Sequence, residues 1–174
     1  MGGSGCAPQR EAALLTLLAL AACAAPLERP EVTTPTGGGP VEAALLIGDW
    51  QCRDLNPLPG QPPQTVATRY ADDGSFRSTS ELPVHGPIGP IEIVQQGRWA
   101  LDGDRLTTSD VRTAARALDG NSETDAYAKA GAELIDAMGA GRPVASRVLL
   151  LDPARLTLRP VDVTDPPVVG CTRS

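Results

Sequence analysis

The chain has 174 residues, a length that suits one domain built around a single hydrophobic core. Acidic residues outnumber lysine and arginine by 21 to 15, which gives a formal net charge of −6 at pH 7. This balance argues against nucleic acid as a partner and against electrostatic attachment to anionic lipid headgroups, because both need clustered basic residues.

The first element of the chain has the pattern of a secretion signal. An apolar run from Ala12 to Ala22, interrupted only by Thr16, follows a short segment whose charges are Arg10 and Glu11. The run has signal-peptide length and is too short to span a bilayer as a permanent helix. We therefore expect export from the cytoplasm.

The run ends in Leu20, Ala21, Ala22 and Cys23. These residues resemble the lipobox of bacterial lipoprotein signals, in which a branched apolar residue and two small residues precede a cysteine. The resemblance implies removal of residues 1–22 and attachment of diacylglycerol and a further acyl chain, such as palmitate, to Cys23. Several acyl chains make a stable anchor. By family analogy, the anchor implies the bacterial cell envelope, at the periplasmic face of the outer membrane if the cell is Gram-negative. Two alternatives stay open: cleavage of an ordinary secretion signal further along, and a short core helix.

The next segment predicts a tether. Residues 24–40 are rich in proline, threonine and glycine and have too few apolar residues to form a core. Fully extended, they would reach at most roughly 55–60 Å. We interpret residues 23–40 as the lipidated cysteine with a flexible tether, and residues 41–174 as the folded domain.

Strand patterns dominate this domain, after a short helical lead-in at 41–47. Alternating apolar residues separated by turn signals predict eight strands. The turn signals are Asp-Asp-Gly at 72–74, Asp-Gly at 102–103 and Asp-Pro at 152–153. Gly97, inside the fourth strand, predicts a bulge or a tight bend. The expected strands are 49–54, 64–71, 75–81, 91–101, 105–112, 146–151, 155–161 and 168–173.

One segment, 122–138, has helical spacing instead, with Ser122 as the N-cap and Gly139 as the stop signal. We expect its apolar stripe to pack against the barrel, in preference to the alternative that the stripe binds a partner. The stripe comprises Tyr127, Ala130, Leu134 and Met138.

The lengths of the connections predict the fold class. Connections after the even-numbered strands are tight turns, and the others are longer. In an up-and-down arrangement these two kinds of connection lie at opposite ends. We therefore predict an all-β, eight-stranded antiparallel up-and-down barrel with one α-helix inserted between strands five and six. Binding sites favour elaborated loops and barrel mouths, and the longer loops are 55–63, 82–90, 113–145 and 162–167.

Gly48-Asp49-Trp50, at the start of the first strand, resembles the Gly-x-Trp motif of the lipocalin-like, or calycin, family. Tyr70 and Phe76, which flank an Asp-Gly turn, resemble a pair found in small bacterial lipocalin-like domains. The resemblance covers about residues 45–174. It implies that Trp50 packs at the closed end against an arginine from near the end of the chain. The inserted helix departs from the family pattern, in which the helix follows the last strand.

Cys52 and Cys171 lie in the first and last expected strands. In an oxidising envelope an isolated pair favours a disulfide, and an even-stranded antiparallel barrel closes by pairing its first strand with its last. If Cys52 faces Cys171, Trp50 faces Arg173, which is the Trp–Arg contact that the family resemblance implies. The alternatives are two free cysteines or a metal site, and one histidine gives a metal site little support.

The sequence contains no motif for nucleophilic catalysis, phosphate-loop binding, dinucleotide binding or metal binding. We expect no enzymatic activity, no cofactor and no metal. The candidate ligand residues in the predicted mouth are His85 and Tyr127, although a solvated loop position is the simpler interpretation of His85. The other aromatic side chains are expected near the closed end: Trp50, Tyr70, Phe76 and Trp99.

The leading functional hypothesis is a monomeric, non-enzymatic envelope lipoprotein that holds a small apolar or lipid-like ligand in its barrel. A barrel filled with side chains would contradict it. The alternative is an envelope inhibitor or interaction module that acts through the Pro/Gly-rich loops 55–63 and 82–90. A hydrolase and a purely structural role are weaker hypotheses, since no catalytic constellation is present.

Overall fold

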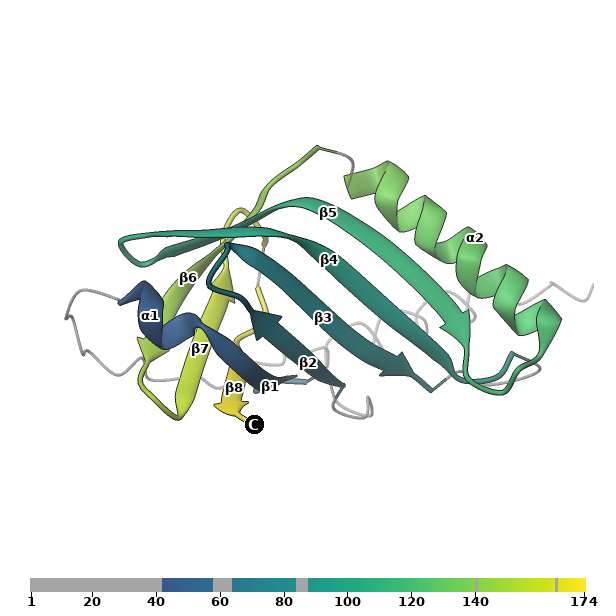
Figure 1. Ribbon diagram of the computed structural model, residues 1–174, viewed down its shortest axis with the longest axis horizontal. Helices are drawn as coiled ribbons and strands as arrows, with labels where there is room; N and C mark the ends of the chain where they lie inside the picture. The colour runs from purple at the N-terminus through teal and green to yellow at the C-terminus, as the bar shows by residue number, and fades with distance from the viewer. Residues whose placement is uncertain (1–41, 58–63, 84–87, 140, 165) are drawn as a thin grey trace, which may run out of the picture. The chain divides into compact units, whose positions relative to one another are not determined.

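The computed structural model describes residues 42–57, 64–83, 88–139, 141–164 and 166–174 (Figure 1). Within these ranges the strands form a closed antiparallel barrel in which each strand pairs with the next and β8 pairs with β1. Helix α2 follows β5 and precedes β6, as the sequence predicted. The elements are α1 (Ala43–Leu46), β1 (Gly48–Asp54), β2 (Thr65–Tyr70), β3 (Ser75–Leu82), β4 (Ile91–Asp102), β5 (Arg105–Ala117), α2 (Ser122–Gly139), β6 (Val144–Leu151), β7 (Arg155–Pro160) and β8 (Val169–Arg173).

Tight turns close one end of the barrel, where β2 meets β3, β4 meets β5 and β6 meets β7. Asp73 Oδ1 accepts a hydrogen bond from Ser75 N at 2.8 Å, and Asp152 Oδ1 accepts one from Ala154 N at 2.8 Å. Gly103 has a φ of +58°, a conformation that glycine adopts without steric cost. The turn residues in the sequence therefore determine this end locally.

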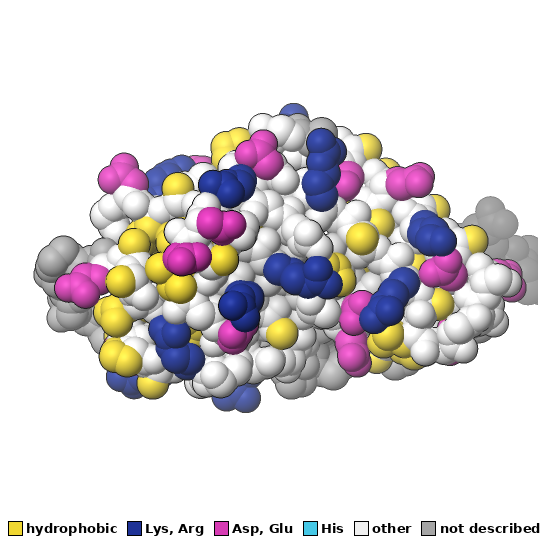
Figure 2. All heavy atoms as spheres, in the orientation of Figure 1, with side chains coloured by type: hydrophobic (Ala, Val, Ile, Leu, Met, Phe, Trp, Pro, Cys, Tyr) yellow, Lys and Arg dark blue, Asp and Glu magenta, His cyan; other side chains and the backbone are white. Residues whose placement is uncertain are grey.

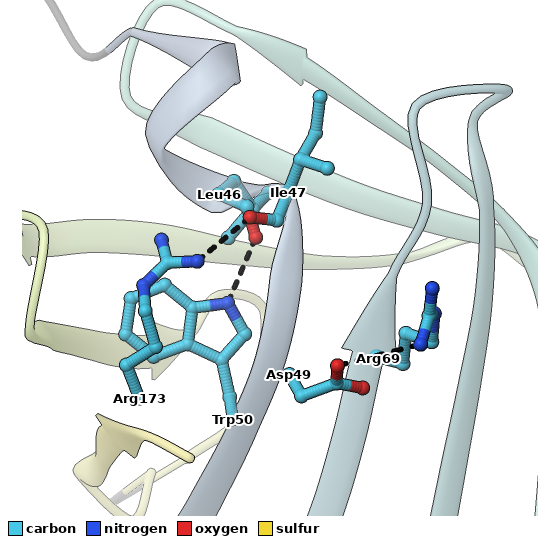
Figure 3. A network of polar contacts seen from close by, with 6 residues as sticks. All are labelled: Leu46, Ile47, Asp49, Trp50, Arg69 and Arg173. Atoms are coloured by element: carbon cyan, nitrogen blue, oxygen red, sulfur yellow. Dashed lines mark hydrogen bonds and ion pairs between the residues drawn. The ribbon is translucent and has the colours of Figure 1, made fainter.

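Trp50 and Arg173 form the plug of the closed end (Figure 3). Trp50 is fully buried, and its Nε1 donates a hydrogen bond to Leu46 O at 2.8 Å. The guanidinium carbon of Arg173 lies 4.4 Å from the centroid of the Trp50 ring. The same guanidinium donates hydrogen bonds to the carbonyl oxygens of Leu45, Ile47 and Pro153. One side chain thereby holds the lead-in helix and the β6–β7 turn to the end of β8.

Gly48 is required for this arrangement. Its φ is +135°, and a Cβ built on it would lie 2.3 Å from Arg173 Nη1. The seam beside it is covalent, because Cys52 and Cys171 face each other across β1 and β8 and form a disulfide. The disulfide prediction is confirmed, and Trp50 is paired with Arg173 in the register that the two cysteines predicted.

A bulge in the β4–β5 ladder places Gly97 opposite two residues of β5, Asp110 and Val111. A Cβ on Gly97 would lie 2.5 Å from Ser109 O and 2.9 Å from a ring carbon of Phe76. The backbone of β4 therefore approaches both β5 and the Phe76 ring more closely than any other residue type permits.

We expect Gly97→Ala to lower the free energy of unfolding by about 1–3 kcal/mol, because the new methyl group overlaps backbone that cannot easily move. Gly131→Ala is the matched control, since no atom other than those of its chain neighbours and of the adjacent helix backbone lies within 4 Å of its Cβ position. Alanine is favoured over glycine by about 1 kcal/mol inside a helix, so the control should be neutral or stabilising. Urea unfolding followed by circular dichroism compares the two variants, and a Gly97→Ala midpoint equal to that of the wild type would contradict the close approach.

Strand β5 extends to Ala117, five residues past the end that the sequence predicted at 112. It pairs with β6 only from Arg105 to Thr108. Beyond that point the bulge bends β5, and α2 runs alongside it (Figure 1). Two carboxylates of the helix replace the missing strand as hydrogen-bond acceptors. Asp136 accepts a hydrogen bond from Thr113 N at 2.7 Å, and Asp125 accepts one from Ala117 N at 3.3 Å.

The prediction of which side of α2 packs on the barrel is wrong. The buried residues of the helix are Thr124, Ala128 and Ala132. Small side chains are needed there because the Asp125 and Asp136 carboxylates must reach the backbone of β5. The predicted stripe faces away: Tyr127 is 57% exposed, Leu134 60% and Met138 65%.

The N-cap of α2 is also displaced by one residue from its predicted position. Asn121 Oδ1 accepts hydrogen bonds from Glu123 N at 2.8 Å and Thr124 N at 3.3 Å, so Asn121 is the cap and Ser122 begins the helix.

None of the helices in the described ranges is long and apolar enough to cross a membrane.

Candidate functional site

A hollow of about 620 Å³ lies inside the barrel, between the sheet and the C-terminal half of α2. This volume is within the usual range of small-molecule pockets, roughly 300–1,000 Å³. Side chains of β2 to β6, β8 and α2 line it. The short β5–β6 pairing accounts for the hollow, because α2 and the segment that follows it cover the gap without filling it.

Aromatic rings from the closed end line part of the cavity. Tyr70 and Phe76 both face it, and Tyr70 also packs edge-on against Trp99, with 5.8 Å between the ring centroids. Burial raises the pKa of Tyr70 to about 12, so its hydroxyl stays protonated at neutral pH. Apolar side chains of three other elements add to this lining: Val111, Ile135 and Val169.

A polar row crosses the sheet in the same cavity. Ser78, Gln95 and Thr113 are in register on β3, β4 and β5. Ser78 Oγ shares a hydrogen bond of 2.9 Å with Thr68 Oγ1. Thr113 Oγ1, by contrast, is buried and has no hydrogen-bond partner among the described residues. An unsatisfied buried hydroxyl costs about 1–3 kcal/mol, so this position favours a bound group that can hydrogen-bond to it.

The rim of the cavity lies where α2 ends and β6 begins. Arg142 and Val144 line it together with Asp136 and Gly139 of the helix. The Asp136 carboxylate is already engaged with the β5 backbone, as described above. The free charged group at the rim is thus the guanidinium of Arg142, which has no carboxylate within 4.0 Å among the described residues.

Of the two residues predicted as ligand contacts, the structure places Tyr127. Tyr127 does not line the cavity and points away from the barrel. His85 and Cys23 lie outside the described residues. The cavity is lined by Tyr70 and Phe76, which the sequence analysis placed near the closed end and did not consider as ligand contacts.

Thr113 was missed because the fifth strand was predicted to end one residue before it. The alternation that continues to Ala117, with Arg112 and Arg116 directed outward, was the signal that could have extended the strand. Gln95 was missed for another reason: strand alternation alone does not distinguish a polar side chain in a cavity from one at a bulge.

No family model and no curated protein matches this sequence. The fold and the site define a class of protein on their own: an eight-stranded antiparallel barrel, closed by a disulfide and a Trp–Arg plug, with an internal cavity beneath an inserted helix. Among the described residues, no group of three histidine, cysteine or acidic side chains is close enough to hold a metal ion.

Proposed function

We propose that this chain is a non-enzymatic, lipid-anchored envelope protein of lipocalin-like type that binds a small, mostly apolar ligand inside its barrel. The observation that carries the proposal is the cavity of about 620 Å³ with aromatic and aliphatic walls. Ligand sites are typically apolar hollows with a few polar groups that fix orientation. The Ser78–Gln95–Thr113 row supplies such groups here.

The ligand that suits these walls is amphipathic. Its apolar part would contact Tyr70, Phe76 and Val169. Its polar end would lie against the polar row of the lining, which consists of Ser78, Gln95 and Thr113. An alcohol, amide or carboxyl group at one end of a short chain or ring system meets both requirements.

The anchor is the second half of the proposal. It rests on the lipobox-like sequence that ends at Cys23, followed by a segment too polar for a core. A barrel on such a tether would remain near the membrane surface, where lipid-like ligands are concentrated. Acyl chains on Cys23 would hold it there, since one chain alone binds only marginally.

Native mass spectrometry of the full-length protein purified from its own membrane tests both halves. We expect a diacylglyceryl and acyl mass on a peptide that begins at Cys23, and a co-purified small molecule on the folded barrel. Ser78→Trp should lose the small molecule because the indole occupies the cavity. Ala100→Trp is the control of equal size, since Ala100 is exposed on β4.

This experiment tests the lipid anchor and the ligand cavity independently of each other. An unmodified N-terminal peptide would contradict the anchor and leave the cavity proposal standing. A small molecule that stays bound equally to Ser78→Trp and Ala100→Trp would contradict the cavity proposal and leave the anchor standing.

A protein-interaction or inhibitory module is the second candidate. Most of the loops first proposed for it lie outside the described residues. The exposed apolar stripe of α2 (Tyr127, Leu134 and Met138) now favours it instead, because apolar side chains gathered on one helix face are typical of contact surfaces. The same native spectra would then show a co-purified protein in place of a small molecule.

A further inference from the structure

A second hollow, of about 470 Å³, lies over the outer surface of β2 to β5. These strands face the viewer in Figures 1 and 2, and Figure 2 shows basic side chains spread across them. Its lining includes one acidic residue, Asp110, and four arginines, which are Arg69, Arg77, Arg98 and Arg112. In a chain of net charge −6, this concentration of positive charge needs an explanation.

Strand register determines the arrangement of the arginines. Arg69 on β2 faces Arg77 on β3, and the row continues through Gln96 on β4 to Arg112 on β5. With adjacent strands about 4.8 Å apart, this row spans about 14 Å. Like charges directly opposite each other destabilise a sheet. Within the row, Arg69 and Arg77 are the pair that face each other directly, so their contact is unfavourable for the sheet unless negative charge accompanies it.

Asp73 and Glu92 interact with Arg98 and Arg77 at longer range, and one carboxylate forms an ion pair with an arginine of the hollow. Arg69, which lines the hollow, pairs with Asp49 at 3.4 Å, and Figure 3 shows this pair. Across the described part of the chain, no carboxylate lies within 4.0 Å of Arg77, Arg98 or Arg112. Four other outward-facing arginines of the barrel have such a partner, namely Arg105, Arg116, Arg147 and Arg155, whereas Arg53 and Arg159 have none among the described residues.

The hollow also has a shape that the fold imposes. It lies over the bulge, where Gly97 leaves the sheet without a side chain between Gln96 and Arg98. Asp110, the acidic residue of the lining, has a φ of +53° and accepts a hydrogen bond from Ser109 Oγ at 3.3 Å. The outer surface of the sheet therefore has a depression at the bulge, and guanidinium groups surround it.

We propose that this hollow binds a doubly charged phosphate-type anion, a phosphate monoester or pyrophosphate, between Arg77, Arg98 and Arg112. The planar guanidinium group presents paired N–H donors that match phosphate oxygens, and such charge-assisted hydrogen bonds are the stronger kind. Because Arg69 pairs with Asp49, the other three arginines of the lining, Arg77, Arg98 and Arg112, stand against Asp110, and a dianion offsets this excess of two positive charges whereas a single carboxylate does not. The negative charge of the whole chain disfavours an extended polyanion such as nucleic acid.

Calorimetric titration of the full-length protein in nanodiscs with inorganic pyrophosphate tests the site. The double variant R77Q/R112Q should bind at least about tenfold more weakly, because two charge-assisted contacts are lost. The matched control R105Q/R147Q removes the same charge from arginines outside the hollow, so its affinity should stay within about twofold of the wild type. Equal losses in both variants, or no pyrophosphate binding by the wild type, would overturn the proposal.

A second arm of the experiment identifies the source of the phosphate. Nanodiscs that contain phosphatidic acid present phosphate monoester headgroups, whereas phosphatidylcholine presents none. If pyrophosphate binds more weakly in the phosphatidic acid discs, and R77Q/R112Q removes this difference, the site accepts a lipid headgroup. If the affinity is the same in both discs, the site takes a soluble phosphate compound. Either result supports the site, because both depend on the same arginines.

Discussion

Reduction of the Cys52–Cys171 disulfide is expected to lower the free energy of unfolding by about 5 kcal/mol, a large part of the stability of a domain of this size. The two cysteines are 119 residues apart, so the bond closes almost the whole barrel domain into one covalent loop. The chain-entropy model assigns a large loss of freedom in the unfolded state to a loop of this length. The bond also lies on the β1–β8 seam, the pairing that joins the two ends of the domain.

Urea unfolding of the full-length protein, followed by tryptophan fluorescence with and without a reductant, measures this effect. The double variant C52S/C171S is the control. It should unfold at the low midpoint of the reduced wild type and should not respond to the reductant. A reductant that shifts the midpoint of this variant as far as that of the wild type would show that the stabilisation has another source.

Trp50→Ala is expected to destabilise the barrel by about 3–5 kcal/mol, the usual range for truncation of a large buried aromatic side chain. Trp50 is fully buried and packs in the core with Leu46 and Leu156. Its removal also leaves Leu46 O without the indole donor and Arg173 without the ring beneath its guanidinium.

Two control variants separate the contributions in the same unfolding assay. Trp50→Phe keeps much of the apolar contact but removes the hydrogen bond, so a loss of about 1–2 kcal/mol is expected. Tyr127→Ala truncates an aromatic side chain that is 57% exposed and should change the stability by less than about 0.5 kcal/mol. A Trp50→Ala midpoint as high as that of Tyr127→Ala would show that the plug does not stabilise the fold.

The disulfide and Trp50 both belong to the part of the barrel whose structure was predicted most completely from the sequence. Glycine and aspartate at three tight turns, and alternating side chains between them, are local signals. Within each strand, the alternation of apolar and polar residues shows which face is buried. The number of strands, their order and the end of the barrel that has the tight turns could therefore be predicted from short stretches of sequence. The register of the seam followed as well, since only Cys52 and Cys171 were available to pair across it.

Side-chain periodicity did not suffice to predict which face of α2 is buried. Both faces contain apolar residues, and the larger ones lie on the face of Tyr127 and Leu134, so periodicity favours that face as the buried one. The buried face is determined by β5. Two backbone N–H groups of β5 that have no strand partner donate hydrogen bonds to Asp125 and Asp136, and this close approach requires small helix residues beside the two carboxylates. The helix sequence contains no information about a hydrogen bond to a strand that precedes it.

By itself, the sequence determined an eight-stranded up-and-down barrel, its disulfide and its Trp–Arg plug, because these features depend on local alternation, turn residues and one cysteine pair. Only the tertiary structure decided where β5 leaves β6, that a cavity remains beneath α2, and that arginines from four strands meet over one hollow. Net charge argued against nucleic acid and anionic lipid surfaces as partners, but net charge is a sum over the whole chain and does not show where basic side chains cluster. The contacts that form a binding site join residues far apart in the chain, and neither composition nor periodicity records which of them become neighbours.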